Sequence, residues 1–194
     1  NAEAIFFAGI TSGCSGAPFN YCPDSTLTRG QMAVFIVRAM SGPSYQPPAC
    51  TGLFTDVPCS HSFARFIEEL SRRGITSGCG GGAFCPEGLV TKRQMAVFLI
   101  AAAFPGTLLP GCQGLFTDVP CGTGFGQPHI EEVYRLGIMP ACGPGFFCPD
   151  SPPITRGQMA GYLVRAFGIP NNARADQGLA VGYGYSNGYL RTVT

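Results

Sequence analysis

Charged side chains are scarce in this chain. Asp, Glu, Lys and Arg make up 12% of its 194 residues, and the formal net charge is +1. A protein that binds nucleic acid usually gathers phosphates with a strong field of one sign. A chain this weakly charged has no such field, so we expect no nucleic-acid partner.

The chain also lacks long apolar runs. A helix that crosses a bilayer needs about 20 consecutive apolar residues, and the longest apolar helix candidate, residues 95–104, is much shorter. We therefore expect no membrane insertion.

Signatures of catalysis are missing too. The chain has only two histidines, and it contains neither an H-E-x-x-H nor a G-x-S-x-G pattern. The neighbouring pairs Glu68–Glu69 and Glu131–Glu132 point in different directions on a helix, so they predict a solvated face rather than a carboxylate pair. We predict that this segment is not an enzyme and needs no cofactor.

Cysteine, by contrast, is abundant. Ten cysteines, an even number, favour an oxidising compartment and a secreted protein. A zinc site would need closely spaced ligands such as C-x₂-C, but the spacings here are larger, and His61 and His129 do not occupy matching positions. No C-x-x-C redox pair occurs either. We predict structural disulfides and no metal.

An internal repeat organises the chain. The octapeptide GLFTDVPC occurs at residues 52–59 and again at 114–121. Each copy precedes apolar residues with helical spacing, a Gly-Ile step, a loop flanked by two cysteines, and a second apolar helix. Thr28, Thr91 and Thr155 each stand three residues before a glutamine, which is the spacing of a capping box at a helix start.

These signals predict a mostly helical fold of three helix-loop-helix repeats that pack around a shared centre. We place the repeats at residues 1–49, 50–111 and 112–170, followed by a tail at 171–194. The first repeat is incomplete, because aligning Gly9 with Gly74 places Asn1 opposite Phe66. Either the mature chain begins there, or residues precede this sequence, or another chain supplies the missing packing.

The repeat also predicts how the cysteines pair. Equivalent positions should pair equivalently, and only pairing within each local loop achieves this for all ten residues. The expected disulfides are Cys14–Cys22, Cys50–Cys59, Cys79–Cys85, Cys112–Cys121 and Cys142–Cys148.

The motifs FTDVP, a helix ending in GI, F-C-P-D and TRGQMA resemble those of the S-layer homology domain, over roughly residues 1–169. The resemblance implies a three-lobed, pseudo-threefold bundle. It also implies an extracellular protein on a bacterial cell surface, held by wall polysaccharide, often a pyruvylated polymer, in grooves between the lobes.

The resemblance further implies candidate glycan-binding residues. The family's "TRAE"-like motif supplies an arginine that contacts the acidic sugar, which by position gives Arg29 and Arg156. Lys92 fills this place in the second repeat, with Arg93 beside it. An arginine at a helix start presents a planar donor fork to an anion. Asp56 and Asp118 of FTDV complete the candidate set, although such residues are also typical of turns and caps.

The tail leaves two structures open. Asn187-Gly188 is typical of a type I′ turn, so residues 178–186 could form a hairpin with 189–194. Alternatively, the tail is extended and adds to a neighbouring surface. The second option supports an alternative function, in which the chain is a structural subunit. Such a subunit would assemble into a homo-oligomer, surface layer or filament through its incomplete first repeat and residues 171–194. A third is the appendage of a secreted hydrolase.

Overall fold

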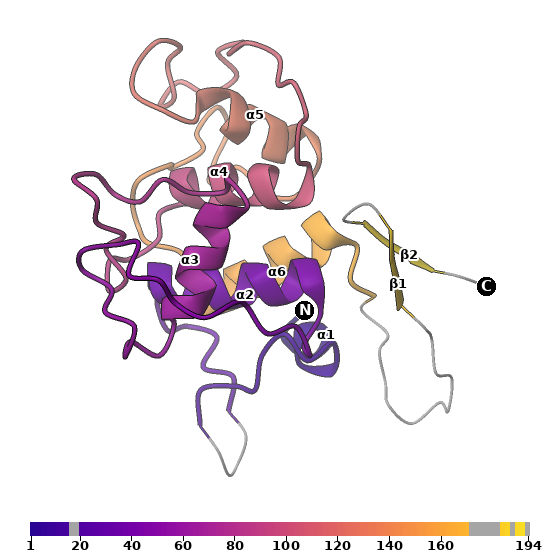
Figure 1. Ribbon diagram of the computed structural model, residues 1–194. Helices are drawn as coiled ribbons and strands as arrows, with labels where there is room; N and C mark the ends of the chain where they lie inside the picture. Colours follow the sequence, from indigo (N-terminus) through magenta and orange to yellow (C-terminus); the bar gives the residue numbers. More distant parts are fainter. Residues whose placement is uncertain (16–19, 171–182, 187–188, 193–194) are drawn as a thin grey trace.

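Six helices and one pair of strands make up the regular structure. The computed structural model describes residues 1–15, 20–170, 183–186 and 189–192. The elements are α1 (Ala2–Phe7), α2 (Arg29–Ser41), α3 (Ala64–Arg72), α4 (Lys92–Ala103), α5 (Gln127–Arg135), α6 (Arg156–Phe167), β1 (Tyr183–Ser186) and β2 (Tyr189–Thr192) (Figure 1). The prediction of a mostly helical fold is confirmed. The division into three repeats stays a prediction, and we use first, second and third repeat below as names for residues 1–49, 50–111 and 112–170.

The starts of α2, α4 and α6 follow directly from the sequence. In each, a threonine hydroxyl accepts a hydrogen bond from the backbone N–H of the glutamine three residues later, and the glutamine side chain accepts one from the threonine N–H. This reciprocal pair satisfies two backbone donors that a helix start leaves without a partner. The predicted capping boxes at Thr28, Thr91 and Thr155 are confirmed.

The ends of α1, α3 and α5 depend on glycine. Gly9, Gly74 and Gly137 have φ angles of 68°, 69° and 68°, in the left-handed region that other residues adopt at a cost. The isoleucine that follows turns back onto the helix, as in the bond from Ile10 N–H to the Ile5 carbonyl at 2.9 Å. The Gly-Ile steps therefore end these helices, as expected.

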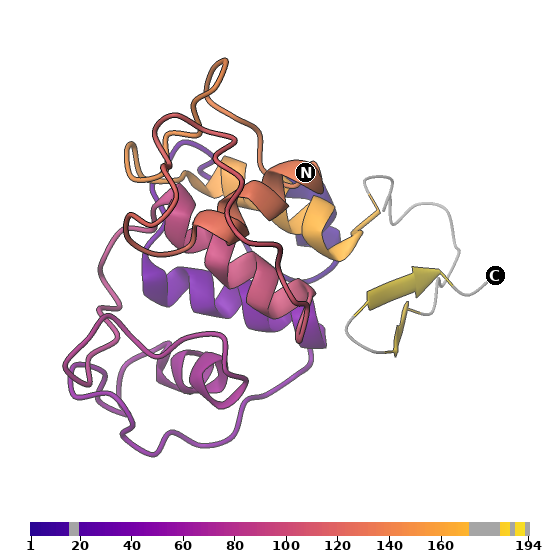
Figure 2. The ribbon, with the colours of Figure 1, turned by 90° about the horizontal axis from the view of Figure 1, so that it is seen from above.

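Three central helices form the middle of the molecule. Helices α2, α4 and α6 contact one another, and each also contacts an outer helix: α3 packs on α2, α5 on α4 and α1 on α6 (Figures 1 and 2). The first and last helices of the chain therefore contact each other. Met32, Met95 and Met159 at equivalent positions of the central helices are 0% exposed.

A ring of backbone hydrogen bonds joins the three segments that lead into the central helices. Leu27 N–H donates to the carbonyl of Ile154 at 3.1 Å, Val90 N–H to that of Leu27 at 3.0 Å, and Ile154 N–H to that of Val90 at 2.9 Å. All three side chains are 0% exposed. The ring fixes the starts of α2, α4 and α6 relative to one another.

The tail contains an antiparallel pair, with Ser186 opposite Tyr189 and Tyr183 opposite Thr192. The structure thus pairs these two strands, whereas the choice between a hairpin and an extended tail over residues 171–194 stays a prediction. The predicted turn residues 187–188 and the rest of the tail lie outside the described residues, so assembly through the tail stays a prediction. Within the described ranges, every helix is too short or too polar to cross a bilayer.

Candidate functional site

All ten cysteines form disulfides, in the five local pairs that the sequence predicts, and none is free. Three close the cysteine loops, which we define as residues 14–22, 79–85 and 142–148. Two close the lead-in segments, residues 50–59 and 112–121. Because each sulfur is bonded to another sulfur, no thiolate remains to bind a metal where Cys50 and Cys59 lie beside Glu68.

The aspartate of each FTDVP motif binds a cysteine loop. Asp56 accepts hydrogen bonds from the N–H groups of Phe84 and Cys85, both at 2.7 Å. Loss of water contact acts to raise the pKa of Asp56. These two donors, together with the N–H of Asp56 itself and the charge of Arg29, outweigh it and keep the pKa below its usual range. Asp118 repeats the arrangement with the N–H groups of Phe147 and Cys148.

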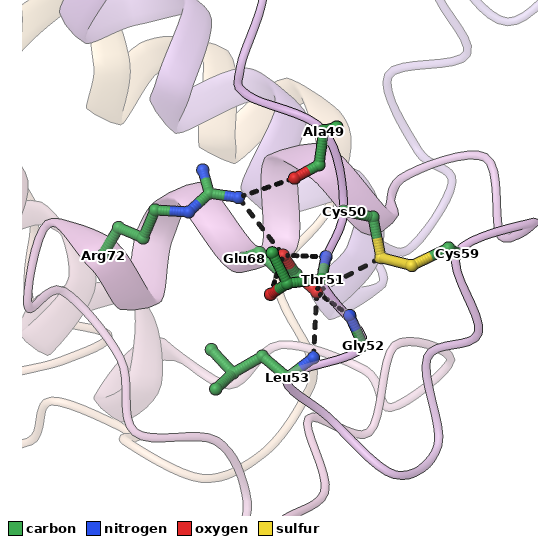
Figure 3. The surroundings of a disulfide bond; sticks show 8 residues. All are labelled: Ala49, Cys50, Thr51, Gly52, Leu53, Cys59, Glu68 and Arg72. Atoms are coloured by element: carbon green, nitrogen blue, oxygen red, sulfur yellow. Dashed lines mark hydrogen bonds and ion pairs between the residues drawn. A yellow bond between two sulfur atoms is a disulfide. The ribbon is translucent and has the colours of Figure 1, made fainter.

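A buried glutamate on each outer helix of the later repeats holds the lead-in segment. Glu68 is 1% exposed and accepts from the N–H groups of Thr51, Gly52 and Leu53 at 2.8–2.9 Å (Figure 3). Burial acts to raise its pKa, yet these hydrogen bonds keep the pKa below its usual range. In the third repeat, the 2% exposed Glu131 accepts from Gln113 N–H at 2.8 Å and Leu115 N–H at 3.0 Å.

The prediction of a solvated glutamate face is therefore wrong for Glu68, Glu69 and Glu131. Glu69 is 5% exposed and accepts from the Tyr45 hydroxyl at 2.6 Å and from Arg73 Nε at 2.8 Å. The lead-in segments run as irregular chain whose N–H groups need acceptors, and the glutamates supply them. The signal that could reveal this was the recurrence of Glu-Glu six and five residues before the Gly-Ile steps at Gly74 and Gly137.

The candidate cations of the TRGQ-type motifs are buried between repeats rather than solvated. Arg29, Lys92 and Arg156 are 5%, 8% and 7% exposed. Arg29 Nε donates to the Phe84 carbonyl at 2.9 Å, which links the first repeat to the second cysteine loop. Arg156 Nε donates to the Tyr21 carbonyl at 3.0 Å and links the third repeat back to the first.

Each arginine also lies between two aromatic rings. The Arg29 guanidinium is 4.7 Å from the ring centre of Phe84 and 5.4 Å from that of Phe98. That of Arg156 is 5.0 Å from Tyr21 and 5.2 Å from Phe35. Such contacts stabilise a cation and fix the plane of the guanidinium. Burial lowers the pKa of Arg29, although nearby Asp56 acts to raise it.

A hydrogen-bond donor is left over in both arginines. The Nη2 atoms of Arg29 and Arg156 are buried and have no partner among the residues that the structure describes. An unpaired donor of this kind costs free energy, about 1–3 kcal/mol or more for a charged group. It points either to strain or to a ligand that supplies the missing acceptor.

Lys92 differs from the two arginines. Its Nζ donates to the carbonyls of Phe147 at 2.6 Å and Pro140 at 2.8 Å, and lies 3.9 Å from the Phe147 ring centre. Burial lowers the pKa of Lys92, although nearby Asp118 acts to raise it. Two of its three donors are thus used within the protein.

Arg93 forms a bidentate ion pair with Asp150. Its Nε and Nη2 each lie 2.8 Å from a carboxylate oxygen of Asp150, and Nη1 donates to the Phe125 carbonyl. The carboxylate raises the pKa of Arg93, and the guanidinium lowers the pKa of Asp150. Arg93 therefore joins the second repeat to the third.

Two grooves between repeats have the same construction. The first groove has a volume of about 490 Å³ and the second about 450 Å³. Each is lined by the loop after a Gly-Ile step, one face of a central helix, a phenylalanine from the next repeat and an arginine from another repeat. That arginine comes from the third repeat in the first groove and from the first repeat in the second groove. The matched residues are Thr11, Gln31, Val34, Phe35, Phe63 and Arg156 in the first groove and Thr76, Gln94, Val97, Phe98, Phe125 and Arg29 in the second.

Of the six candidate glycan-binding residues, the structure thus brings only Arg29 and Arg156 to the lining of these grooves. Lys92, Arg93, Asp56 and Asp118 have partners within the protein. Sequence reasoning missed the aromatic partners Phe35 and Phe98, because their helical spacing is also that of core residues.

Comparison with known proteins agrees with part of the sequence resemblance. Residues 53–96 match the S-layer homology domain. A "Cell surface protein" of Thermoanaerobacter kivui is 28% identical over 124 residues, which is 62% of this chain. The matched region covers 16% of that protein, so the chain spans a small part of its length.

Proposed function

We propose that this chain is a non-catalytic module of the bacterial cell surface that holds its protein on cell-wall polysaccharide. The match of residues 53–96 to the S-layer homology domain and the likeness to a cell surface protein support this role. Five disulfides fit a protein that works outside the cell. We also propose that the three repeats are arranged about a pseudo-threefold axis, which the closed hydrogen-bond ring supports.

One observation carries the proposal of binding: the same groove occurs twice, each time with a buried arginine that has an unpaired Nη2. A carboxylate on the polysaccharide would supply an acceptor that suits a guanidinium. Because Nη2 is buried, the ligand would reach it only after a local shift of the side chain. Lys92, with two donors already used, would hold the third cysteine loop instead.

Charge reversal in the grooves tests this function. Val34 and Val97 are half-buried in matched lining positions, so glutamate there would repel an acidic polymer. We expect Val34→Glu with Val97→Glu to reduce co-sedimentation with purified bacterial wall fragments at least tenfold. The matched control, Val34→Gln with Val97→Gln, has nearly the same shape without charge and should retain most binding. Equal binding by both double variants would contradict the proposal.

A further inference from the structure

The two grooves share a construction but differ in charge. Arg38 and Arg156 both line the first groove, whereas Arg29 is the one cation on the wall of the second among the residues that the structure describes. Alignment of the capping boxes places Ala101 of α4 opposite Arg38 of α2. Within the same described ranges, no aspartate or glutamate lines either groove. The first groove therefore has the stronger positive potential.

Arg38 is held in place without a carboxylate partner. It is half-buried, its Nη1 lies 3.4 Å from the Ile10 carbonyl, and its guanidinium carbon lies 5.8 Å from the ring centre of Phe66. Its Nε and Nη2 have no hydrogen-bond partner, and no carboxylate pairs with it, in the part of the chain that the structure describes. Two donor groups and an unneutralised charge are thus available to a ligand in the first groove.

The contact that positions Arg38 recurs in the third repeat. Arg165 of α6 matches Arg38, and Ile138 matches Ile10. Arg165 Nε donates to the Ile138 carbonyl at 2.7 Å. Arg165 lies outside the lining of both grooves, so it provides a matched arginine with the same backbone contact and no place in either site.

The second repeat lacks this arrangement. Ala101 replaces the arginine, and His129 stands at the position of Phe66. The Nδ1 atom of His129 is buried and has no partner among the described residues. Burial lowers the pKa of His129, so the imidazole is neutral at pH 7 and does not replace the missing charge.

Hydroxyl groups add to the difference between the grooves. Ser25 and Thr26 line the first groove, and both are exposed. The matched residues of the second repeat, Gly88 and Leu89, have no polar side chain. Arg156 N–H donates to the Ser25 carbonyl at 2.9 Å, so the two hydroxyls belong to a segment that runs beside the start of α6. The first groove therefore also offers more hydrogen-bonding groups.

We propose that the two grooves bind different stretches of the polysaccharide, and that Arg38 sets the difference. The first groove takes a stretch with two acidic groups, one at Arg156 and one at Arg38. The second takes a stretch with a single acidic group, at Arg29. This inference rests on the proposed function. Because a second acidic group has no cation to meet in the second groove, the first groove is the tighter site for a highly charged polymer.

Proteins with a single open groove test the difference. Val97→Glu leaves the first groove open, and Val34→Glu leaves the second open. With acidic oligosaccharides released from bacterial wall polysaccharide, we expect the first groove to bind about fivefold more tightly in calorimetry at about 50 mM NaCl. This ratio should fall below about twofold at roughly 500 mM NaCl, because salt screens the additional charge contact. Equal affinities at low salt would overturn the inference.

Replacement of Arg38 identifies the group responsible. In the Val97→Glu protein, Arg38→Gln should weaken binding about fivefold and reduce its dependence on salt. Arg165→Gln is the matched control, since it removes the same contact to an isoleucine carbonyl outside the grooves. It should leave affinity unchanged. Equal losses from both changes, or no loss from Arg38→Gln, would contradict the role of Arg38.

The reverse exchange should create the missing contact. Ala101→Arg with His129→Phe, placed in the Val34→Glu protein, reproduces the pair of Arg38 and Phe66 in the second groove. We expect affinity for the same oligosaccharides to rise about fivefold at low salt. Unchanged affinity in a variant that circular dichroism shows to be folded would contradict the inference.

The inference and the proposed function fail in different ways. Wild-type protein that binds no acidic oligosaccharide would overturn both. Two grooves that bind with equal affinity at every salt concentration would overturn the inference and leave the proposed function standing.

Discussion

The three cysteine loops end on a cysteine of similar backbone conformation in different surroundings. Cys22, Cys85 and Cys148 all have a positive φ, at 54°, 59° and 56°. The later loops are held by Asp56 and Asp118 from a lead-in segment, whereas the first loop has no such partner within the described ranges. The left-handed conformation of the closing cysteine therefore does not depend on the lead-in segment, whose contribution is added stability and the burial of apolar surface.

The largest expected effect on stability comes from breaking the disulfides, which close loops in all three repeats. Each closes a short loop and stabilises the fold by about 2–2.5 kcal/mol in the chain-entropy model, so the five together contribute of order 10 kcal/mol. That is comparable with the whole stability of a domain. We expect reduction to unfold the protein at 25 °C, measured by circular dichroism. A reduced protein that still melts cooperatively near the oxidised melting temperature would contradict this expectation.

The matched glutamates give the next largest effect. The carboxylate of Glu68 accepts several hydrogen bonds from backbone N–H groups, and Glu68→Gln would remove its charge. We expect this change to lower the free energy of unfolding in urea by about 3 kcal/mol. Glu3→Gln, its matched control, should change stability by less than about 0.5 kcal/mol, because Glu3 is exposed. Similar losses of stability from both variants would mean that Glu3 and Glu68 contribute equally, which contradicts the difference between the first and second repeats.

Acid should weaken the later repeats selectively. Glu68 and Asp56 have folded-state pKa values below their usual range. Their contribution is therefore present above the unfolded pKa, about 4, and is lost as pH falls through the lower folded pKa. We expect the stability gap between wild type and Glu68→Gln to shrink steadily between pH 5 and pH 2. A constant gap would show that the carboxylate charge is not responsible.

Features that depend on residues close together in the sequence could be predicted, whereas those that depend on residues far apart could not. Capping boxes, Gly-Ile helix ends and short disulfides are local, so residues such as Thr28 and Gly74 indicated them directly. The pairing of an outer helix with a central helix of another repeat, and the burial of Arg29 against Phe84, depend on contacts far apart in sequence. The prediction for Glu68 was wrong because its burial depends on the path of the lead-in segment, whose N–H groups it binds, and the sequence does not give that path.

The smallest effect should come from exchanging the cations. Arg29→Lys places in the second groove the residue type found at Lys92. Lysine keeps the charge but loses the planar contact between Phe84 and Phe98, so we expect a loss of about 1 kcal/mol in urea unfolding. A gain in stability would show that the unpaired Nη2 costs more than the aromatic contacts contribute.

The most direct test of the proposed function is a calorimetric titration with short acidic oligosaccharides released from bacterial wall polysaccharide. Our account predicts two sites per chain, one site after Val97→Glu, and none after Val34→Glu with Val97→Glu. Three equivalent sites, or binding that survives the double substitution in a folded protein, would contradict it.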